Sequence, residues 1–296
     1  MSAAYQGAQQ ITPSDEGVTK VICPTTDLAA ALKFFEDILG YTVEDKSEAS
    51  STPLFSQHAV LGTPNGLAIQ LVVVRPEFAN RFPGTIVSVA VSDFHETCSA
   101  LGAHGIDIWS DSETPDETPD QTLFNAPDGT VFQIVQTKGG KTRAPSAQGE
   151  TGPYQPPPNA DSVFGALGNT GVEWILVPTQ RLDAMAAFLG DVLGYSKVTG
   201  GIPSEDLQYT RYALFTTPSG VVLELVEPTA EHAPRYPAPV VSFTVPDLND
   251  AIDAVQRSEA ELLTDVFAPN SPFSWVYFRT PGGGTFQLQG PVSAAI

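Results

Sequence analysis

The spacing of hydrophobic and polar positions changes in a regular order along the chain. Val18–Cys23 is a short apolar run typical of a buried strand. From Leu28 to Leu39 the apolar residues recur every three or four positions, which predicts one face of a helix. Asp27 is placed to cap the start of this helix, and Gly40 is placed to end it. Short β-rich runs follow at Tyr41–Glu44, His58–Leu61 and Leu67–Val74, so the predicted order is βαβββ.

The same order of elements returns directly afterwards. Ile86–Val91 is predicted to be a strand, and a helix is predicted to start at Asp93, with Glu96 completing a capping box. Three further strands are expected at Ile106–Trp109, Gln121–Asn125 and Thr130–Gln136. The first half of the chain therefore holds two βαβββ modules.

The second half of the chain repeats the first. Leu28–Tyr41 and Leu182–Tyr195 share one pattern at an offset of 154 residues (182 − 28). The same offset relates the Thr-Pro-Asn-Gly turn at 63–66 to the Thr-Pro-Ser-Gly turn at 217–220, and Phe132-Gln133 to Phe286-Gln287. Matches spread over this length without a change of offset indicate a tandem duplication. The chain is expected to be an α+β protein of four modules.

The repeat also predicts the domain boundaries. Residues 1–16 are polar and are expected to be a disordered tail, 17–137 a first domain and 163–296 a second domain, each of two modules. The segment 138–162 is rich in Gly, Pro, Lys and Gln, lacks apolar periodicity and is predicted to be the linker.

Composition narrows the possible partners. Hydrophobic residues make up 42 % of the 296 residues and charged residues 16 %, which is typical of a globular protein. A net charge of −20 repels nucleic acid and anionic lipid surfaces, so neither is an expected partner. Cys23 and Cys98 cannot form a disulfide framework, and no signal core or membrane span is recognised. We expect a cytoplasmic monomer or homodimer.

Several short motifs resemble those of a known superfamily. They are the helix end at Phe35–Tyr41 with its counterpart at Phe188–Tyr195, and the closing segment Asn125–Thr130 with its counterpart at Thr280–Thr285. This pattern resembles the vicinal oxygen chelate superfamily, which holds glyoxalase I, extradiol ring-cleaving dioxygenases, fosfomycin-resistance enzymes and bleomycin-binding proteins. The resemblance implies that paired modules curl into two cupped β-barrels around small-molecule sites, with the helices outside.

The resemblance also implies where a metal ion would be held. Its ligands come from the first and last strands of each module and are usually His or Glu, occasionally Gln. The corresponding positions in this chain are Lys20, Gln70, Ile86, Gln133, Trp174, Glu224, Val240 and Gln287. Lysine is protonated at neutral pH, aliphatic side chains cannot coordinate, and Glu224 is the one ionisable oxygen ligand of the eight. We therefore expect no metal site and no cofactor.

The candidate site residues allow more than one interpretation. Glu224 and Lys20 are candidate catalytic groups for proton transfer, although a strand-end lysine also reaches solvent readily. Gln70, Gln133 and Gln287 either bind a ligand or hydrogen-bond within the protein. Trp174, Phe124 and Phe278 are candidate walls of a ligand pocket, although aromatic residues on strands commonly form core.

Three hypotheses for function follow. The leading one is a glyoxalase/bleomycin-resistance-like protein that binds a small aromatic or planar molecule without a metal. The alternative is an isomerase, lyase or cyclase that uses Glu224 or Lys20 for proton transfer, or, as a weaker form, a metal-dependent glyoxalase or dioxygenase. The third is a structural or regulatory module whose pockets are filled by side chains. Whether the protein is an enzyme is left open by the sequence.

Overall fold

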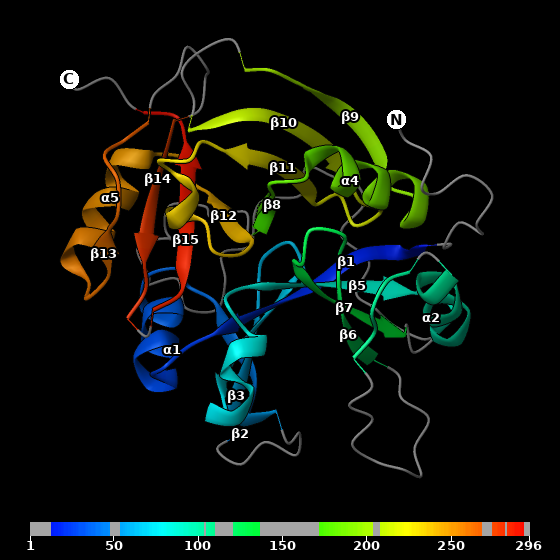
Figure 1. Cartoon of the computed structure of the whole chain (residues 1–296). Coiled ribbons are helices and arrows are strands. Elements are labelled where there is room, and N and C mark those ends of the chain that lie inside the picture. Colours follow the sequence, from blue (N-terminus) through cyan, green and yellow to red (C-terminus); the bar gives the residue numbers. More distant parts are fainter. Residues whose placement is uncertain are drawn as a thin grey trace, which may run out of the picture. The chain divides into compact units, whose positions relative to one another are not determined.

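The computed structural model describes residues 13–47, 54–103, 105–109, 121–136, 172–203, 208–267, 274–281 and 283–292 (Figure 1). The elements of the first half are β1 (Pro13–Pro24), α1 (Leu28–Asp37), β2 (Thr42–Ser47), β3 (Phe55–Gly62), β4 (Ala68–Val74), the 3-10 turn η1 (Pro76–Arg81), β5 (Ile86–Val91), α2 (Phe94–Ala103), β6 (Gln121–Asn125) and β7 (Val131–Gln136). Those of the second half are β8 (Val172–Pro178), α4 (Leu182–Ala187) with its π-helical continuation η2 (Phe188–Val192), β9 (Ser196–Gly201), β10 (Tyr209–Thr216), β11 (Val222–Pro228), η3 (Ala233–Arg235), β12 (Val240–Thr244), α5 (Leu248–Arg257), β13 (Glu261–Leu262), β14 (Ser274–Arg279) and β15 (Thr285–Gly290).

The α+β class and the order of elements agree with the sequence prediction. The Asp27 carboxylate accepts a hydrogen bond from the Ala30 N–H at 3.0 Å, so the predicted cap of α1 is confirmed. Gly40 has φ +72°, a left-handed conformation that costs glycine little, and it follows the end of this helix. Two differences are local. β1 begins at Pro13 rather than Val18, and the expected strand at Ile106–Trp109 is only a single bridge from Ile108 to Phe124.

The strands form two mixed sheets. The strand order is β2-β3-β4-β1-β5-β7-β6 in the seven-stranded sheet and β13-β14-β15-β12-β8-β11-β10-β9 in the eight-stranded sheet. Among the described residues, the strands at the two ends of each order have one neighbour only, so neither sheet closes. The expected β-barrels are therefore corrected to cupped, open sheets.

Contacts between backbone segments divide the chain into two compact units. The first comprises Met1–Lys20, Ile86–Ala144 and Ile175–Pro239, and the second comprises Val21–Thr85, Pro145–Trp174 and Val240–Ile296. Each unit thus combines segments from both halves of the sequence repeat. Several predicted features lie outside the described residues: the boundaries at 137 and 163, the linker 138–162 and most of the tail. The predicted domain division stays a prediction.

Each unit has a core in which a helix of one half packs on strands of the other half. In the second unit, the Phe34 ring of α1 lies 5.6 Å from the Phe278 ring of β14. In the first unit, the Phe188 ring that follows α4 lies 5.9 Å from the Phe124 ring of β6. Phe34 and Phe188 are equivalent in the repeat, as are Phe278 and Phe124. The two units therefore share one mode of packing, and such aromatic pairs contribute more than their buried area alone.

The repeated turns hold the first strand of the other half in the same way. The Asn65 side chain donates from Nδ2 to the Val172 carbonyl at 2.5 Å and accepts from the Val172 N–H at 3.3 Å. Ser219, the equivalent of Asn65, accepts from the Val18 N–H at 3.2 Å. Each turn thus hydrogen-bonds to the backbone of the first strand of the other half, at Val172 in β8 and at Val18 in β1.

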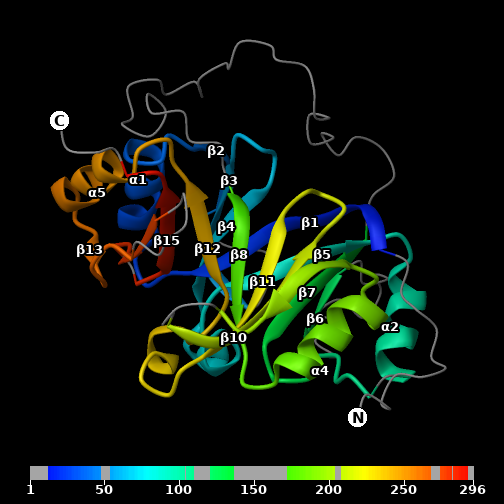
Figure 2. The same cartoon turned by 90° about the horizontal axis from the view of Figure 1, so that it is seen from above.

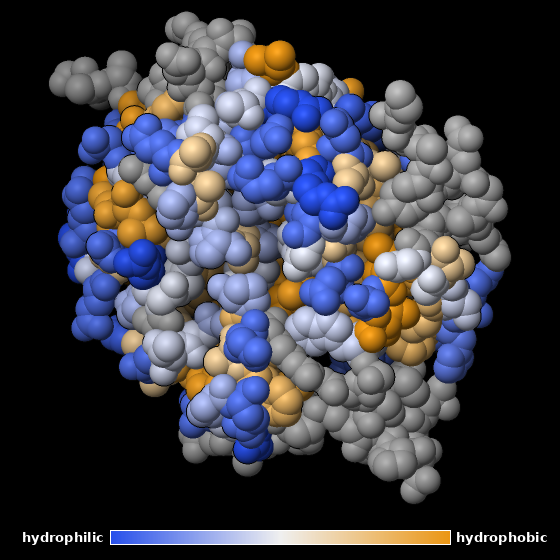
Figure 3. Space-filling model, viewed as in Figure 1, coloured by the Kyte–Doolittle hydropathy of each residue, from blue (hydrophilic) through white to orange (hydrophobic). Residues whose placement is uncertain are grey.

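Helices cover one face of the strands within each unit. Figures 1 and 2 show α4 lying along β10 and β11 in the first unit and α5 beside β14 and β15 in the second. On the molecular face of Figure 3, apolar residues are scattered among hydrophilic ones. No helix in the described part of the chain is long and apolar enough to cross a membrane.

Candidate functional site

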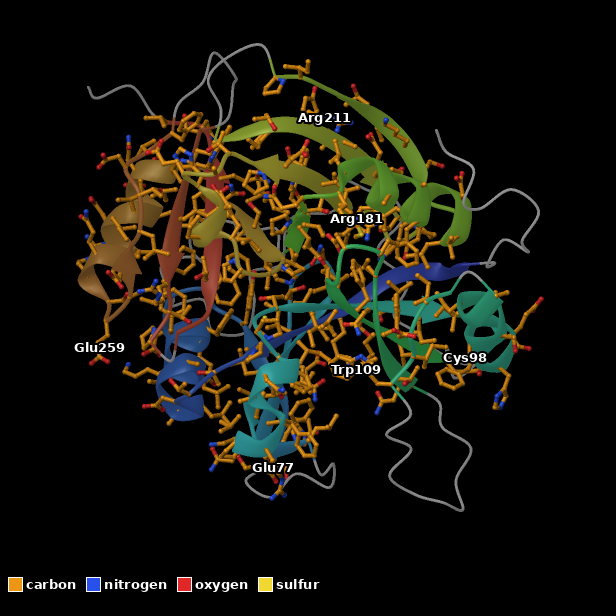
Figure 4. All side chains as sticks on the ribbon, in the orientation of Figure 1. Glu77, Cys98, Trp109, Arg181, Arg211 and Glu259 are labelled. Carbon is orange, nitrogen blue, oxygen red and sulfur yellow. The ribbon has the colours of Figure 1, made fainter. Side chains whose placement is uncertain are left out.

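The two faces of the β10–β11 ladder carry different side chains. Arg211, which is labelled in Figure 4, pairs with Glu227 across the ladder. Its guanidinium also contacts Asp183 of α4 at 2.5 Å. These residues therefore mark the face that the helix covers. Because side chains alternate along a strand, the neighbouring pairs Tyr212–Val226 and Leu214–Glu224 point to the opposite, helix-free face. A bulge between Tyr209 and Arg211 shifts Tyr209 onto the helix-free face as well.

We call Tyr209, Tyr212 and Glu224 the tyrosine face. Glu224 is 9 % exposed, and the Tyr209 hydroxyl donates to its Oε1 at 3.3 Å. The Tyr209 and Tyr212 rings are half-buried and meet at 6.2 Å with their planes 62° apart. Burial and the nearby Glu224 carboxylate raise the pKa of the Tyr209 hydroxyl above its usual range. Tyr209 is therefore a protonated donor at neutral pH, beside two ring surfaces that solvent reaches.

The predicted glutamines Gln133 and Gln287 hydrogen-bond to hydroxyl groups of the protein. In the first unit the Ser88 hydroxyl donates to Gln133 Oε1 at 2.8 Å. In the second unit Gln287 Nε2 donates to the Tyr277 hydroxyl at 2.9 Å. Gln133 is 8 % exposed and Gln287 is 4 % exposed, so both amides lie in the interior. Of the two uses considered for buried amides, the structure shows the contact within the protein.

The other predicted site residues are divided between core and surface. Phe124 and Phe278 have no exposed area. The ring of Phe188 covers Phe124, and the ring of Phe34 covers Phe278. A ring in that position packs the core, so their interpretation as pocket walls is not kept. Lys20, Gln70 and Trp174 are half-buried. Gln70 pairs with Val60 across β3 and β4.

The sequence pattern did not identify Ser88 as the hydrogen-bond partner of Gln133 or Tyr209 as the partner of Glu224. Ser88 and Tyr209 carry no motif of their own. Their one signal is position: Ser88 is adjacent to Gln133 across a parallel pair of strands, and Tyr209 lies on the strand beside Glu224. Finding them requires the strand register, which the sequence pattern does not give.

The side chains at the implied metal positions do not fit a divalent cation. Lys20, Ile86, Trp174 and Val240 offer no suitable donor, and Gln133 and Gln287 are bound to hydroxyl groups. Over the residues that the structure describes, no three His, Cys, Asp or Glu side chains lie close enough together to hold a metal ion. The donor set at these positions is thus one carboxylate with neutral amides, aliphatics, an indole and an amine.

One family model matches the first part of the chain. Residues 17–134 match the model of the Glyoxalase/Bleomycin resistance protein/Dioxygenase superfamily. This segment of the chain belongs to that superfamily. The resemblance to the vicinal oxygen chelate proteins is thereby confirmed. No curated protein matches the chain at a significant level.

Solved structures share this fold over nearly the whole chain. The 2,3-dioxygenase LapB from Pseudomonas sp. KL28 is 13 % identical with a TM-score of 0.59, and the match covers 96 % of each chain. A mutant of 4-hydroxymandelate synthase from Streptomyces coelicolor is 13 % identical with a TM-score of 0.57, covering 96 % of this chain and 94 % of that one. The Mn(II)-bound glyoxalase from Novosphingobium aromaticivorans is 12 % identical with a TM-score of 0.55, covering 93 % and 82 %. At these identities the comparison shows the fold alone.

Proposed function

We propose that this protein binds a small planar or aromatic molecule on the tyrosine face, without a metal ion. The observation that carries the proposal is the buried Glu224 carboxylate beside the half-exposed rings of Tyr209 and Tyr212. Small-molecule sites commonly combine flat apolar surface with a few fixed polar groups. Here the rings supply the flat surface, and the Tyr209–Glu224 pair supplies a hydrogen-bonded polar group.

The fixed geometry of this pair supports a role in recognition. The Tyr209 hydroxyl is held by its hydrogen bond to Glu224, so little side-chain freedom remains to be lost when a ligand binds. The proposal of metal independence rests on the chemistry of the side chains at the implied ligand positions. Amides that hydrogen-bond to serine and tyrosine hydroxyls are weak ligands for a divalent cation.

A matched pair of variants tests the proposal. Native mass spectrometry of the purified protein first identifies a co-purifying small molecule, and titration calorimetry then gives its affinity. Glu224→Gln is expected to weaken this affinity about tenfold or more, by altering a buried charged hydrogen bond. The control Glu227→Gln lies three register pairs away on the opposite face, beside Arg211, and should leave affinity unchanged. Equal effects of both substitutions would refute binding at the tyrosine face.

Metal independence is tested separately by elemental analysis. Protein purified without chelator and dialysed is expected to hold Mn, Fe, Ni and Zn well below one ion per chain. A stoichiometric ion that is needed for ligand binding would refute this part of the proposal, while leaving the assignment of the face intact.

A second candidate function is proton transfer by Glu224 in an isomerase, lyase or cyclase reaction. The supporting observation is that the carboxylate is buried and hydrogen-bonded to a neutral phenol, an arrangement in which general bases and acids are found. The half-buried amine of Lys20 is the other candidate group. In D2O, an enzyme of this kind would exchange a carbon-bound proton of the ligand, as followed by NMR. Loss of exchange in Glu224→Gln with retained affinity would favour catalysis, and absence of exchange in the wild type would favour binding alone.

A further inference from the structure

The turn between β3 and β4 contains Asn65 and Gly66, which form the one Asn-Gly pair of the sequence. The matching turn of the second half has Ser219 and Gly220 in these places. In each turn the N–H of the glycine donates to the carbonyl of the threonine three residues earlier, at 2.9 Å. The two glycines also share a left-handed backbone, with φ +85° and +82°. The turns therefore have the same backbone form and differ in one side chain.

The amide of Asn65 is bound at both of its polar atoms to the backbone of β8. Nδ2 donates to the Val172 carbonyl at 2.5 Å, and Oδ1 accepts from the Val172 N–H at 3.3 Å. The Thr63 hydroxyl lies 2.7 Å from the same Oδ1. Val172 has no exposed area, so its carbonyl depends on a donor from the protein. A side-chain amide supplies that donor, and a carboxylate cannot.

An asparagine followed by glycine is chemically labile. The backbone nitrogen of the glycine attacks the asparagine Cγ and forms a C–N bond, the bond from Cγ to Nδ2 breaks, and ammonia leaves. Water then opens the cyclic imide to aspartate or isoaspartate. Gly66 favours the attack because it is exposed and has no side chain. Apart from its chain neighbours, no atom of the described residues lies within 4 Å of the place that a Cβ would take.

We propose that Asn65 is a deamidation site that is protected by its hydrogen bonds to β8 and reacts when this contact opens. In the closed turn both reacting groups are occupied, because the Gly66 N–H bonds to the Thr63 carbonyl and the Asn65 amide bonds to Val172. These bonds must break before the nitrogen can lose its proton and reach Cγ. The chemistry is slow compared with reclosure, so its rate follows the fraction of open molecules. The inference does not depend on the tyrosine face.

Deamidation makes the opening permanent. The aspartate formed at position 65 places a carboxylate oxygen where Nδ2 donated to the Val172 carbonyl. The buried carbonyl then loses its donor and faces a second acceptor, which destabilises the closed contact. The reaction also adds one negative charge to a chain of net charge −20. The second turn cannot react in this way, since Ser219 carries no amide, and its bond from the Val18 N–H is kept.

The first test follows the reaction itself. Purified protein is incubated at pH 8, either folded or unfolded in guanidinium chloride, and peptide mass spectrometry measures aspartate and isoaspartate at position 65. The unfolded chain should react about tenfold faster or more, as expected for the loss of two ordinary hydrogen bonds. Asn65→Ser, which copies the turn of the second half, is the control and should give no product. Equal rates in the folded and unfolded chains would overturn the inference, as would absence of reaction in the unfolded chain.

A second measurement separates the contact with β8 from the general rigidity of the turn. The Val172 N–H donates to Asn65, so its hydrogen exchange, followed by NMR, reports the opening of this contact. Low concentrations of guanidinium chloride that accelerate this exchange should accelerate deamidation by the same factor. A deamidation rate that stays constant while the exchange rate rises severalfold would contradict protection by β8.

A third test measures the consequence of the reaction. Asn65→Asp carries the carboxylate of the product from the start, and its equilibrium constant for urea unfolding should be about tenfold above that of the wild type. Stability equal to the wild type would refute the predicted detachment from β8. Ligand affinity at the tyrosine face, which lies in the other compact unit, should stay unchanged in this variant. Failure of this inference and failure of the proposed function are therefore distinguishable.

Discussion

Phe278→Ala tests whether the Phe278 ring belongs to the core, where the structure places it, or to the wall of a ligand pocket, which the sequence also allowed. The Phe278 ring has no exposed area and contacts the rings of Phe34, Phe243 and Phe286 at centroid distances of 5.6, 6.5 and 5.9 Å. Truncation of a buried phenylalanine costs about 3–5 kcal/mol. Because the ring also takes part in three aromatic contacts, we expect a loss near the upper part of that range, about 4 kcal/mol.

The assay is urea unfolding followed by circular dichroism, with ligand affinity measured on the same samples. The matched control is Tyr212→Ala, which truncates a half-exposed ring on the tyrosine face. We expect this control to lose about 1 kcal/mol of unfolding free energy and most of its ligand affinity. The reverse outcome, in which Phe278→Ala is nearly as stable as the wild type but no longer binds ligand, would refute the assignment of this ring to the core.

Two further predictions concern stability. Burial raises the pKa of the Cys23 thiol from 9.0 to about 12, against a smaller opposing effect of its hydrogen bond from Thr85. The unfolded chain therefore loses this proton first, and the unfolding free energy should fall by about 1.4 kcal/mol per pH unit above pH 9. Cys23→Ala should lack this slope in urea titrations at pH 8 to 10, and identical slopes would contradict the prediction. Asn65→Ala removes two bonds to the buried backbone of Val172 and should cost about 1–3 kcal/mol by thermal or urea unfolding. Ser219→Ala, which removes only one bond to the Val18 backbone, should cost less, and equal losses would count against this account.

The sequence by itself determined the modules and their order. Helix caps, strand runs and turns depend on residues within a few positions of one another, so the Asp27 cap, the strand Ile86–Val91 and the Gly40 terminus could all be predicted. The offset of 154 residues showed that the halves share one fold, and the short motifs indicated the superfamily. These signals are local or repeated in the sequence, so they can be recognised without knowledge of the tertiary structure.

Only the tertiary structure decided what each side chain contacts. Gln133 and Gln287 occupy the same repeat position, yet one bonds to Ser88 and the other to Tyr277, because the facing strand carries leucine in one half and tyrosine in the other. The sequence left Phe124 as either a pocket wall or a core residue, and the structure places it in the core because a helix from the other half covers its face. Strand register, and which face of a sheet a helix covers, are decided by contacts between residues far apart in the chain. The alternation of hydrophobic and polar residues is the same whichever face is covered, so it does not predict the covered face.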